Sequence, residues 1–115
     1  MEYLLRLEKE NNISLPEAYK VFYRNCKSHI PEKLVGTDLL NNVPDLYIAA
    51  IDLLEENGVD NFLKEDDLVF MMHQGYMFWY FNANGDTDPI VYGYREGNLM
   101  PDKLEKFSDF IKEFL

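Results

Sequence analysis

The sequence predicts an α+β fold built around a mainly antiparallel sheet. Two observations lead to this class. Apolar residues recur at helical spacing near both ends and in the middle of the chain, and three strand-like segments joined by short turns form a meander over about residues 68–94. Strands joined by short turns run antiparallel, and helices grouped before and after such a sheet are typical of α+β proteins. The chain has 115 residues, 47% of them hydrophobic, so we expect one domain over residues 1–115.

Two N-terminal helices are expected in the first quarter of the chain. Residues 2–10 carry apolar side chains at helical spacing, and the sequence NNIS then interrupts the pattern. Ser14 is followed three residues later by Glu17, which predicts a capping box at the start of a helix over about residues 15–26. Four residues at i, i+3, i+4 and i+7 give that helix one buried face: Tyr19, Phe22, Tyr23 and Cys26.

A middle helix and a C-terminal helix flank the strand region. Residues 34–40, LVGTDLL, favour a short strand with a glycine kink. The middle helix is expected from about Asp45, as its cap, to Asn57, because Gly58 can adopt the positive φ that ends helices well. The closing sequence FSDFIKEFL presents one apolar helical face: Phe107, Phe110, Ile111 and Phe114.

The central meander is predicted from three consecutive segments. Residues 68–72 read as the first strand, Gln74-Gly75 as a tight turn and residues 76–81 as the return strand; a third strand starts at Pro89, after the turn-rich NANGDTD. Successive side chains of a strand point to opposite faces, and both faces of residues 76–81 are apolar. We therefore expect this strand to be central and covered, at least in part, on both sides.

The aromatic side chains of residues 76–94 allow two interpretations. In the first, all of them belong to the core. In the second, tyrosine and tryptophan, which tolerate half-burial, form a partly exposed patch surrounded by carboxylates and bind a protein partner. The candidate partner-binding residues are Tyr76, Trp79, Tyr80, Asp66, Asp67, Asp86 and Asp88.

The net charge of −10 arises in the middle of the chain. Residues 34–94 hold Lys64 as their single basic residue against eleven Asp and Glu, whereas the segments before and after them are nearly neutral. An acidic surface repels phosphate, so we expect no binding to nucleic acid or to anionic membranes. Such a surface attracts a basic protein partner, although acidity of this kind also serves solubility alone.

Localisation follows from features that the sequence lacks. It has no stretch of about 18 uninterrupted apolar residues, and its N-terminus does not have the pattern of a secretory signal. Cys26 is the only cysteine, which excludes an internal disulfide. We therefore expect a cytoplasmic protein.

Residues suited to catalysis or metal binding are few. Cys26 and His29 have a C-x-x-H spacing, but no further cysteine completes a zinc site. NANGDTD alternates oxygen ligands as a calcium loop does, yet Gly93 stands where a bidentate glutamate is needed. We expect no catalytic residue, no metal and no cofactor; a nucleophilic Cys26, paired with His29 or His73, is the enzyme alternative.

Three segments, taken in order, carry a family likeness. SLPEAYKVFYRN has an LP-x-x-Y-x-x-F pattern; VFMMHQGYMFWYFNANGDTDPIVYGYREG contains a QGY turn, an aromatic strand and a DPxVY strand; FSDFIKEFL is similar to a closing SF-x-x-FL pattern. The set resembles the SUKH superfamily, which includes the fungal Smi/Knr-type cell-wall regulators and many bacterial immunity proteins.

The resemblance implies an α+β fold with a mainly antiparallel sheet flanked by helices. It also implies a bacterial immunity protein that binds a polymorphic toxin, often a nuclease, and blocks it in the producing cell. That role requires no catalytic residue, and it suits the concentrated negative charge because nucleases tend to be basic where they hold nucleic acid. A regulatory or scaffolding protein-interaction module, as in the fungal branch, is the alternative.

Overall fold

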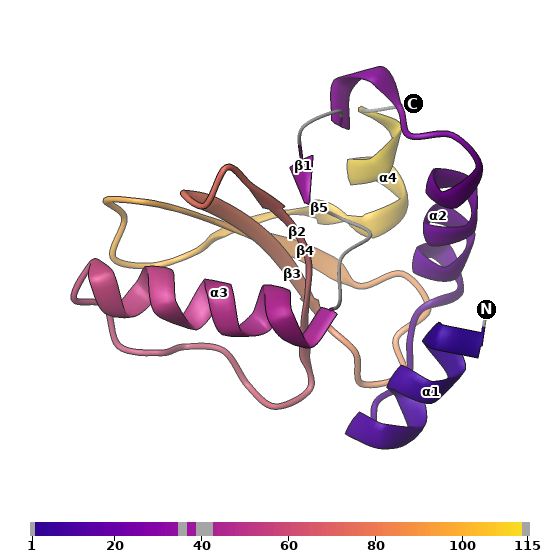
Figure 1. Ribbon diagram of the computed structural model, residues 1–115, viewed down its shortest axis with the longest axis horizontal. Coiled ribbons are helices and arrows are strands. Elements are labelled where there is room, and N and C mark those ends of the chain that lie inside the picture. Colours follow the sequence, from indigo (N-terminus) through magenta and orange to yellow (C-terminus); the bar gives the residue numbers. More distant parts are fainter. Residues whose placement is uncertain (1, 35–36, 39–42, 114–115) are drawn as a thin grey trace.

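A five-stranded antiparallel sheet forms the centre of the computed structural model, which describes residues 2–34, 37–38 and 43–113 (Figure 1). The strands follow one another across the sheet in chain order. The α+β class is confirmed, and the predicted three-strand meander is extended by one strand at each edge. The strands are β1 (Thr37–Asp38), β2 (Asp67–His73), β3 (Met77–Asn82), β4 (Ile90–Arg95) and β5 (Asp102–Lys106).

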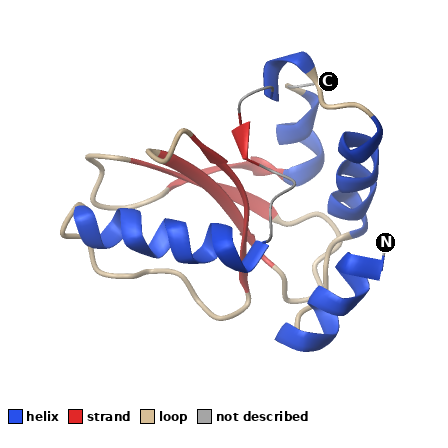
Figure 2. Ribbon diagram, in the orientation of Figure 1, coloured by secondary structure: helices blue, strands red, loops and turns tan. Residues whose placement is uncertain are grey.

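Helices cover both faces of this sheet. The middle helix α3 (Val43–Glu56) runs across one face, while α2 (Glu17–Ser28) and α4 (Phe107–Lys112) lie against the other, and α1 (Glu2–Asn11) lies below α2 (Figures 1 and 2). A short 3-10 helix, η1, spans Glu32–Leu34. Among the described residues, no helix is both long and apolar enough to cross a bilayer.

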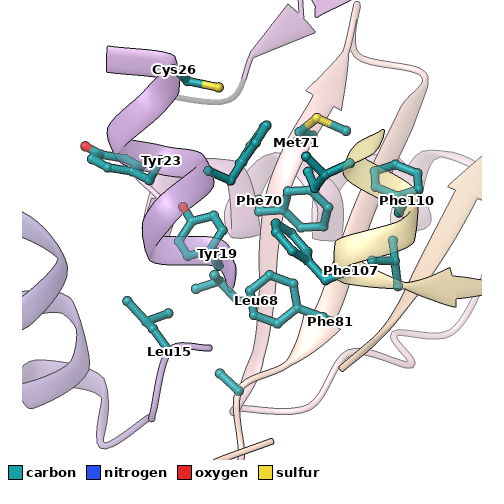
Figure 3. Packing of buried hydrophobic residues seen from close by; sticks show 14 of the residues in the cluster. Leu15, Tyr19, Tyr23, Cys26, Leu68, Phe70, Met71, Phe81, Phe107 and Phe110 are labelled. Atoms are coloured by element: carbon teal, nitrogen blue, oxygen red, sulfur yellow. The ribbon is translucent and has the colours of Figure 1, made fainter. Parts of the chain in front are cut away.

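The core is divided by the sheet into two clusters. The larger cluster packs α1, α2 and α4 against β2 and β3, with Tyr19 and Phe107 at its centre (Figure 3). The second cluster packs α3 against the opposite face, where it contacts Phe78 and Tyr94. Strand β3 is therefore central and covered on both sides, as its two apolar faces predict. The predicted buried face of α2 is also confirmed: Tyr19, Phe22, Tyr23 and Cys26 are all buried.

The predicted capping box at Ser14 is wrong. Helix α2 begins at Glu17, its N-cap is Pro16, and no side chain caps it. The Ser14 backbone is used elsewhere, because its N–H donates to the Ala83 carbonyl at 3.1 Å and the residue forms a parallel bridge with Asn84. Tertiary pairing of this segment with the end of β3 replaces the local cap.

The start of α3 also differs from its prediction. The helix begins at Val43, two residues earlier than expected, so Asp45 lies in its first turn instead of capping it. A carboxylate there still interacts favourably with the helix dipole. The predicted stop is confirmed, since Gly58 follows the helix with φ +67°.

The β2–β3 hairpin turn agrees with its prediction. Gln74 and Gly75 have φ +50° and +78°, and the Tyr76 N–H donates to the His73 carbonyl at 3.2 Å. Two successive positive φ values are typical of a type I′ turn, whose twist matches that of the flanking strands. The turn sets the register from His73–Met77 to Met71–Trp79, and a one-residue shift between Val69 and Met71 then brings Asp67 opposite Asn82 at the far end.

Two segments departed from the expected pattern. Strand β5 was not predicted, because all five of its residues are exposed and four are charged, so it has no apolar alternation to reveal it. Charged side chains are the usual protection of an edge strand. Of the described residues within 34–40, Thr37–Asp38 form a strand and Leu34 ends the short helix η1. The expected kink at Gly36 lies outside the described residues, as does Phe114 of the predicted C-terminal face.

Candidate functional site

A hollow of about 400 Å³ opens at the end of the sheet that lies away from the β2–β3 turn. The loop before β2 forms one side of it, and residues of β3 and β4 form the other. We call it the acidic hollow. Its lining consists of aromatic, carboxylate and amide side chains with one lysine: Phe62, Lys64, Asp66, Asp67, Tyr80, Asn82, Asn84 and Tyr92.

Two carboxylates are held side by side in the acidic hollow by one amide. The Asn82 Nδ2 donates to Asp66 Oδ1 at 2.8 Å and to Asp67 Oδ1 at 2.9 Å. The strand register places Asn82 opposite Asp67, and the Ala83 N–H fixes the Asp66 main chain by donating to its carbonyl at 2.8 Å. Asp67 Oδ2 accepts a further bond from the Lys64 N–H at 2.8 Å. Both carboxylates are thus oriented by neutral donors.

Neither of these carboxylates has a cationic partner among the described residues. The ion pairs between described residues join Glu8 to Lys20, Glu17 to Arg24 and Asp109 to Lys112. Lys64 lines the hollow, yet its ammonium group belongs to none of these pairs. Because a carboxylate has lone pairs for about four hydrogen bonds, Asp66 and Asp67 retain acceptor capacity toward the hollow.

Stacked aromatic rings form the wall beside the carboxylates. Tyr80 and Tyr92 are directly paired on β3 and β4, with ring centroids 5.3 Å apart and an interplanar angle of 19°. Phe62 stacks on Tyr80 at 5.9 Å and 29°. Tyr80 is only 6% exposed. Its burial, with smaller contributions from Asp67 and Tyr92, raises the pKa of its phenol well above the ordinary value, so this group stays a neutral hydrogen-bond donor.

The predicted partner-binding aromatics do not form one patch. Tyr80 lines the acidic hollow on the α3 side. Trp79 lies on the opposite face, where it packs against the larger core cluster with its ring centroid 6.3 Å from that of Phe110. Tyr76 is half-buried in the hairpin turn, in edge contact with His73 at 5.7 Å. Their predicted partner contacts stay predictions; what the structure brings together is Tyr80, Asp66 and Asp67.

The two acids of the 82–89 turn have different surroundings. Asp88 accepts from the Ser108 N–H at 2.9 Å and from the Ser108 hydroxyl at 2.6 Å, so its carboxylate satisfies the start of α4. Asp86 is exposed, and its N–H donates to Asn84 Oδ1 at 3.3 Å. The Asp86 side chain is therefore accessible from solvent, whereas the Asp88 carboxylate is used in a structural contact.

Sequence reasoning did not include Asn82, Tyr92 or Phe62 in the site. Asn82 does not follow from the turn alone, because an unbroken register would pair Asp67 with Ala83, and an irregularity between Val69 and Met71 brings Asn82 opposite Asp67 instead. The direct pairing of Tyr92 with Tyr80 depends on the loop between β3 and β4, whose conformation the sequence does not give. No periodicity marks Phe62, which comes from the irregular segment before β2.

A second hollow of about 420 Å³ adjoins the first, and Asp67 borders both. It lies between α1, α3 and the start of β2. Ile48, which is 58% exposed on α3, and Tyr47 form part of its wall. Its remaining lining is mostly apolar: Leu7, Asn11, Ile13, Glu65, Leu68 and Val69. An apolar cleft thus continues the acidic hollow along the surface.

The exposed side of α3 carries carboxylates that form no ion pair with a basic residue in the described part of the chain. The four carboxylates are exposed: Asp45, Asp52, Glu55 and Glu56. Together with the acidic hollow, this helix makes one side of the molecule strongly negative. We call this surface, α3 with the two hollows beside it, the α3 side.

The surroundings of Cys26 do not favour a nucleophile. It is 2% exposed on the apolar face of α2, and burial raises the pKa of its thiol to about 11, which keeps it protonated. His73 Nδ1 lies 3.0 Å from the Thr37 hydroxyl, with which it shares a hydrogen bond. Among the described residues, no hydrogen bond joins Cys26 to a histidine, and no three His, Cys, Asp or Glu side chains are grouped to hold a metal ion.

Family comparison agrees with the fold. A model of the SMI1/KNR4 family (SUKH-1) matches residues 2–113, which include every described helix and strand. No curated protein and no solved structure matches the chain. The match covers nearly the whole sequence, including the segment between residues 27 and 67 that carries α3 and much of the acidic hollow. The chain therefore belongs to the SMI1/KNR4 family (SUKH-1).

Proposed function

We propose that this chain is an immunity protein that neutralises a cognate bacterial toxin by binding to it stoichiometrically. The observation that carries the proposal is the uncompensated negative charge of the α3 side, which continues into two adjoining hollows. Such a surface complements a basic protein and raises the rate of encounter with it. A toxin that cleaves nucleic acid presents this kind of basic surface, so a nuclease is the expected partner.

Occlusion is the mechanism that these features support best. The Asp66 and Asp67 carboxylates of the acidic hollow are held by main-chain and amide donors, which preorganises this part of the contact surface. The chain acts on its partner by covering it, in the cytoplasm of the producing cell, and needs no catalytic group or cofactor to do so. A scaffolding role predicts binding of a partner without loss of the partner's activity.

Titration of the toxin domain encoded beside this gene in the producing genome tests the proposal. We expect a 1:1 complex by calorimetry and complete loss of toxin activity at equivalence. The double charge reversal Asp52→Lys/Glu55→Lys on α3 is expected to slow association at least about tenfold, since rim charges act mainly on encounter.

The matched control is Asp102→Lys/Glu105→Lys on β5. It changes the net charge equally, at two exposed positions outside the α3 side. We expect a much smaller effect on association from this variant. Equal effects of the two variants would show that overall charge, not the α3 side, governs the encounter, and full toxin activity in a 1:1 mixture would reject the immunity role.

A further inference from the structure

We propose that the acidic hollow is a binding pocket for one guanidinium group, supplied by an arginine side chain of the protein partner. The pocket combines two kinds of group that recognise this cation. Asp66 and Asp67 supply carboxylate oxygens, and Tyr80 and Tyr92 supply a stacked aromatic wall. The identity of the partner rests on the proposed function, whereas the affinity for guanidinium does not.

The carboxylates lack the cation that their arrangement favours. Two negative groups bonded to a single amide repel each other, and a cation between them would relieve this repulsion. Lys64 is the one basic side chain in the lining, but its main chain is tied through its N–H to Asp67 and through its carbonyl to the Tyr47 hydroxyl, at 3.4 Å, while its ammonium makes no ion pair with the described carboxylates. A cationic ligand can therefore act as the counter-ion of Asp66 and Asp67.

Tyr80 adds a hydrogen-bonding group to the wall of the hollow. The residue is 6% exposed and lines the hollow, yet its hydroxyl makes no hydrogen bond to a described residue. Among the described residues only the Tyr19 hydroxyl is buried without a partner, so the Tyr80 hydroxyl is open to the hollow, where water or a ligand completes its hydrogen bonds. A carboxyl, carbonyl or ordered water accompanying the incoming side chain would accept its proton.

The geometry selects arginine over lysine. A guanidinium is planar, presents five N–H donors in a fork and stacks on aromatic faces, so it can lie along the Tyr92 ring and donate to both carboxylates at once. An ammonium group is compact and more strongly hydrated, and it gains less from an aromatic wall. The hollow of about 400 Å³ is large enough for this group together with part of its methylene chain.

Nα-acetyl-L-argininamide is a probe that requires no knowledge of the partner. Its binding to the ¹⁵N-labelled protein is followed by NMR, with the Asn82 side-chain amide as the reporter because that group donates to both carboxylates. We expect saturable shifts confined to this amide and to the lining of the hollow. Nα-acetyl-citrullinamide, a neutral molecule of the same shape, should bind at least about tenfold more weakly, and the lysine analogue should be intermediate.

Two variants separate the contributions of charge and stacking. Asp66→Asn/Asp67→Asn should weaken binding at least about tenfold while it keeps similar side-chain volumes. Tyr92→Leu leaves both carboxylates in place and should weaken binding about threefold, which keeps the test decisive if the double variant is unstable. Asp52→Asn/Asp86→Asn is the matched control outside the lining and should leave the affinity unchanged.

Each outcome supports or overturns the pocket. Shifts spread over α3 without saturation, equal binding of the citrulline analogue, or unchanged affinity in Asp66→Asn/Asp67→Asn and Tyr92→Leu would each overturn it. The tests of the proposed function are independent of the tests of the pocket. If argininamide binds but the toxin stays active, the pocket stands and the immunity role falls; if the toxin is inhibited equally by the wild-type and the Asp66→Asn/Asp67→Asn proteins, the role stands and the partner's arginine is excluded.

Discussion

The two sides of the sheet differ in how they compensate charge. On the side of α1, α2 and α4, acidic and basic residues alternate, and all three ion pairs of the described residues lie there. On the α3 side Lys64 lines the acidic hollow, but none of the acids there forms an ion pair among the described residues. Surface ion pairs contribute little to stability, so the difference matters less for folding than for the potential that each side presents to other molecules.

The geometry of the aromatic ring contacts also differs between the two sides. Around Tyr19 the rings of the larger cluster meet mainly edge to face, deep inside the protein, at 5.5 to 6.2 Å. On the α3 side the rings of Phe62, Tyr80 and Tyr92 are stacked and border a hollow. Both sides contain buried rings, but only on the α3 side do stacked rings and carboxylates line one hollow.

Truncation of an aromatic residue gives the largest expected contrast between the sides. Phe81 is 0% exposed and lies within 5.5 Å of Tyr19 and Phe107, measured between ring centroids. Phe81→Ala should lower the free energy of unfolding by about 3–5 kcal/mol in urea denaturation. Ile48→Ala, at an exposed position on α3, should change it by less than about 0.5 kcal/mol. A similar loss at both positions would mean that Ile48 is packed as a core residue and does not belong to the free surface of α3.

Asp88 and Asp86 sharpen the comparison within a single loop. Asp88→Ala removes the acceptor of two hydrogen bonds to Ser108 at the start of α4 and should cost about 1–2 kcal/mol. Asp86→Ala removes an exposed carboxylate and should change stability by less than about 0.5 kcal/mol. Thermal and urea unfolding of both variants measure the difference, and an equally destabilised Asp86→Ala protein would contradict the assignment of Asp86 to the free surface.

The sequence predicts the features that have a local signal, and it misses contacts between segments that are distant along the chain. The buried face of α2 and the Gln74-Gly75 turn have strong local signals, namely helical spacing and a glycine at positive φ, and both predictions are confirmed. The Asp88–Ser108 contact joins segments 20 residues apart and has no local signal. Tertiary pairing also displaced the expected Ser14 cap, which local propensity alone supports.

The site was predicted only in part for a related reason. Asp66, Asp67 and Tyr80 were identified from charge and residue type, and the structure brings them together. Trp79 was grouped with Tyr80, although the two-residue period of a strand places neighbours on opposite faces. The strand alone therefore separates the two side chains, whereas the covering of both faces by helices depends on the arrangement of the whole chain.

Two buried tyrosines provide a finer test of the two sides. Tyr19 and Tyr94 are both 0% exposed, but the Tyr94 hydroxyl donates to the Asn98 carbonyl at 2.7 Å, whereas the Tyr19 hydroxyl has no partner among the described residues. Tyr94→Phe should therefore cost about 1 kcal/mol. Tyr19→Phe removes a buried unsatisfied hydroxyl and should leave stability unchanged or raise it by up to about 1 kcal/mol. If both variants lost the same stability, the Tyr19 hydroxyl would have a partner after all.

The smallest expected effect is the alkaline titration of Tyr19. Burial, with the nearby Tyr23, raises the pKa of this phenol far above its ordinary value of 10.0. The folded state therefore keeps the proton while the unfolded state releases it, so the contribution of this group to stability is complete below pH 10 and decreases as the pH rises above it. At pH 10, where half of the unfolded tyrosine is ionised, the loss is about 0.4 kcal/mol. Urea denaturation between pH 8 and 11 should show a steeper decrease for the wild-type protein than for Tyr19→Phe, and parallel curves would mean that the phenol ionises as readily in the folded protein as in the unfolded chain.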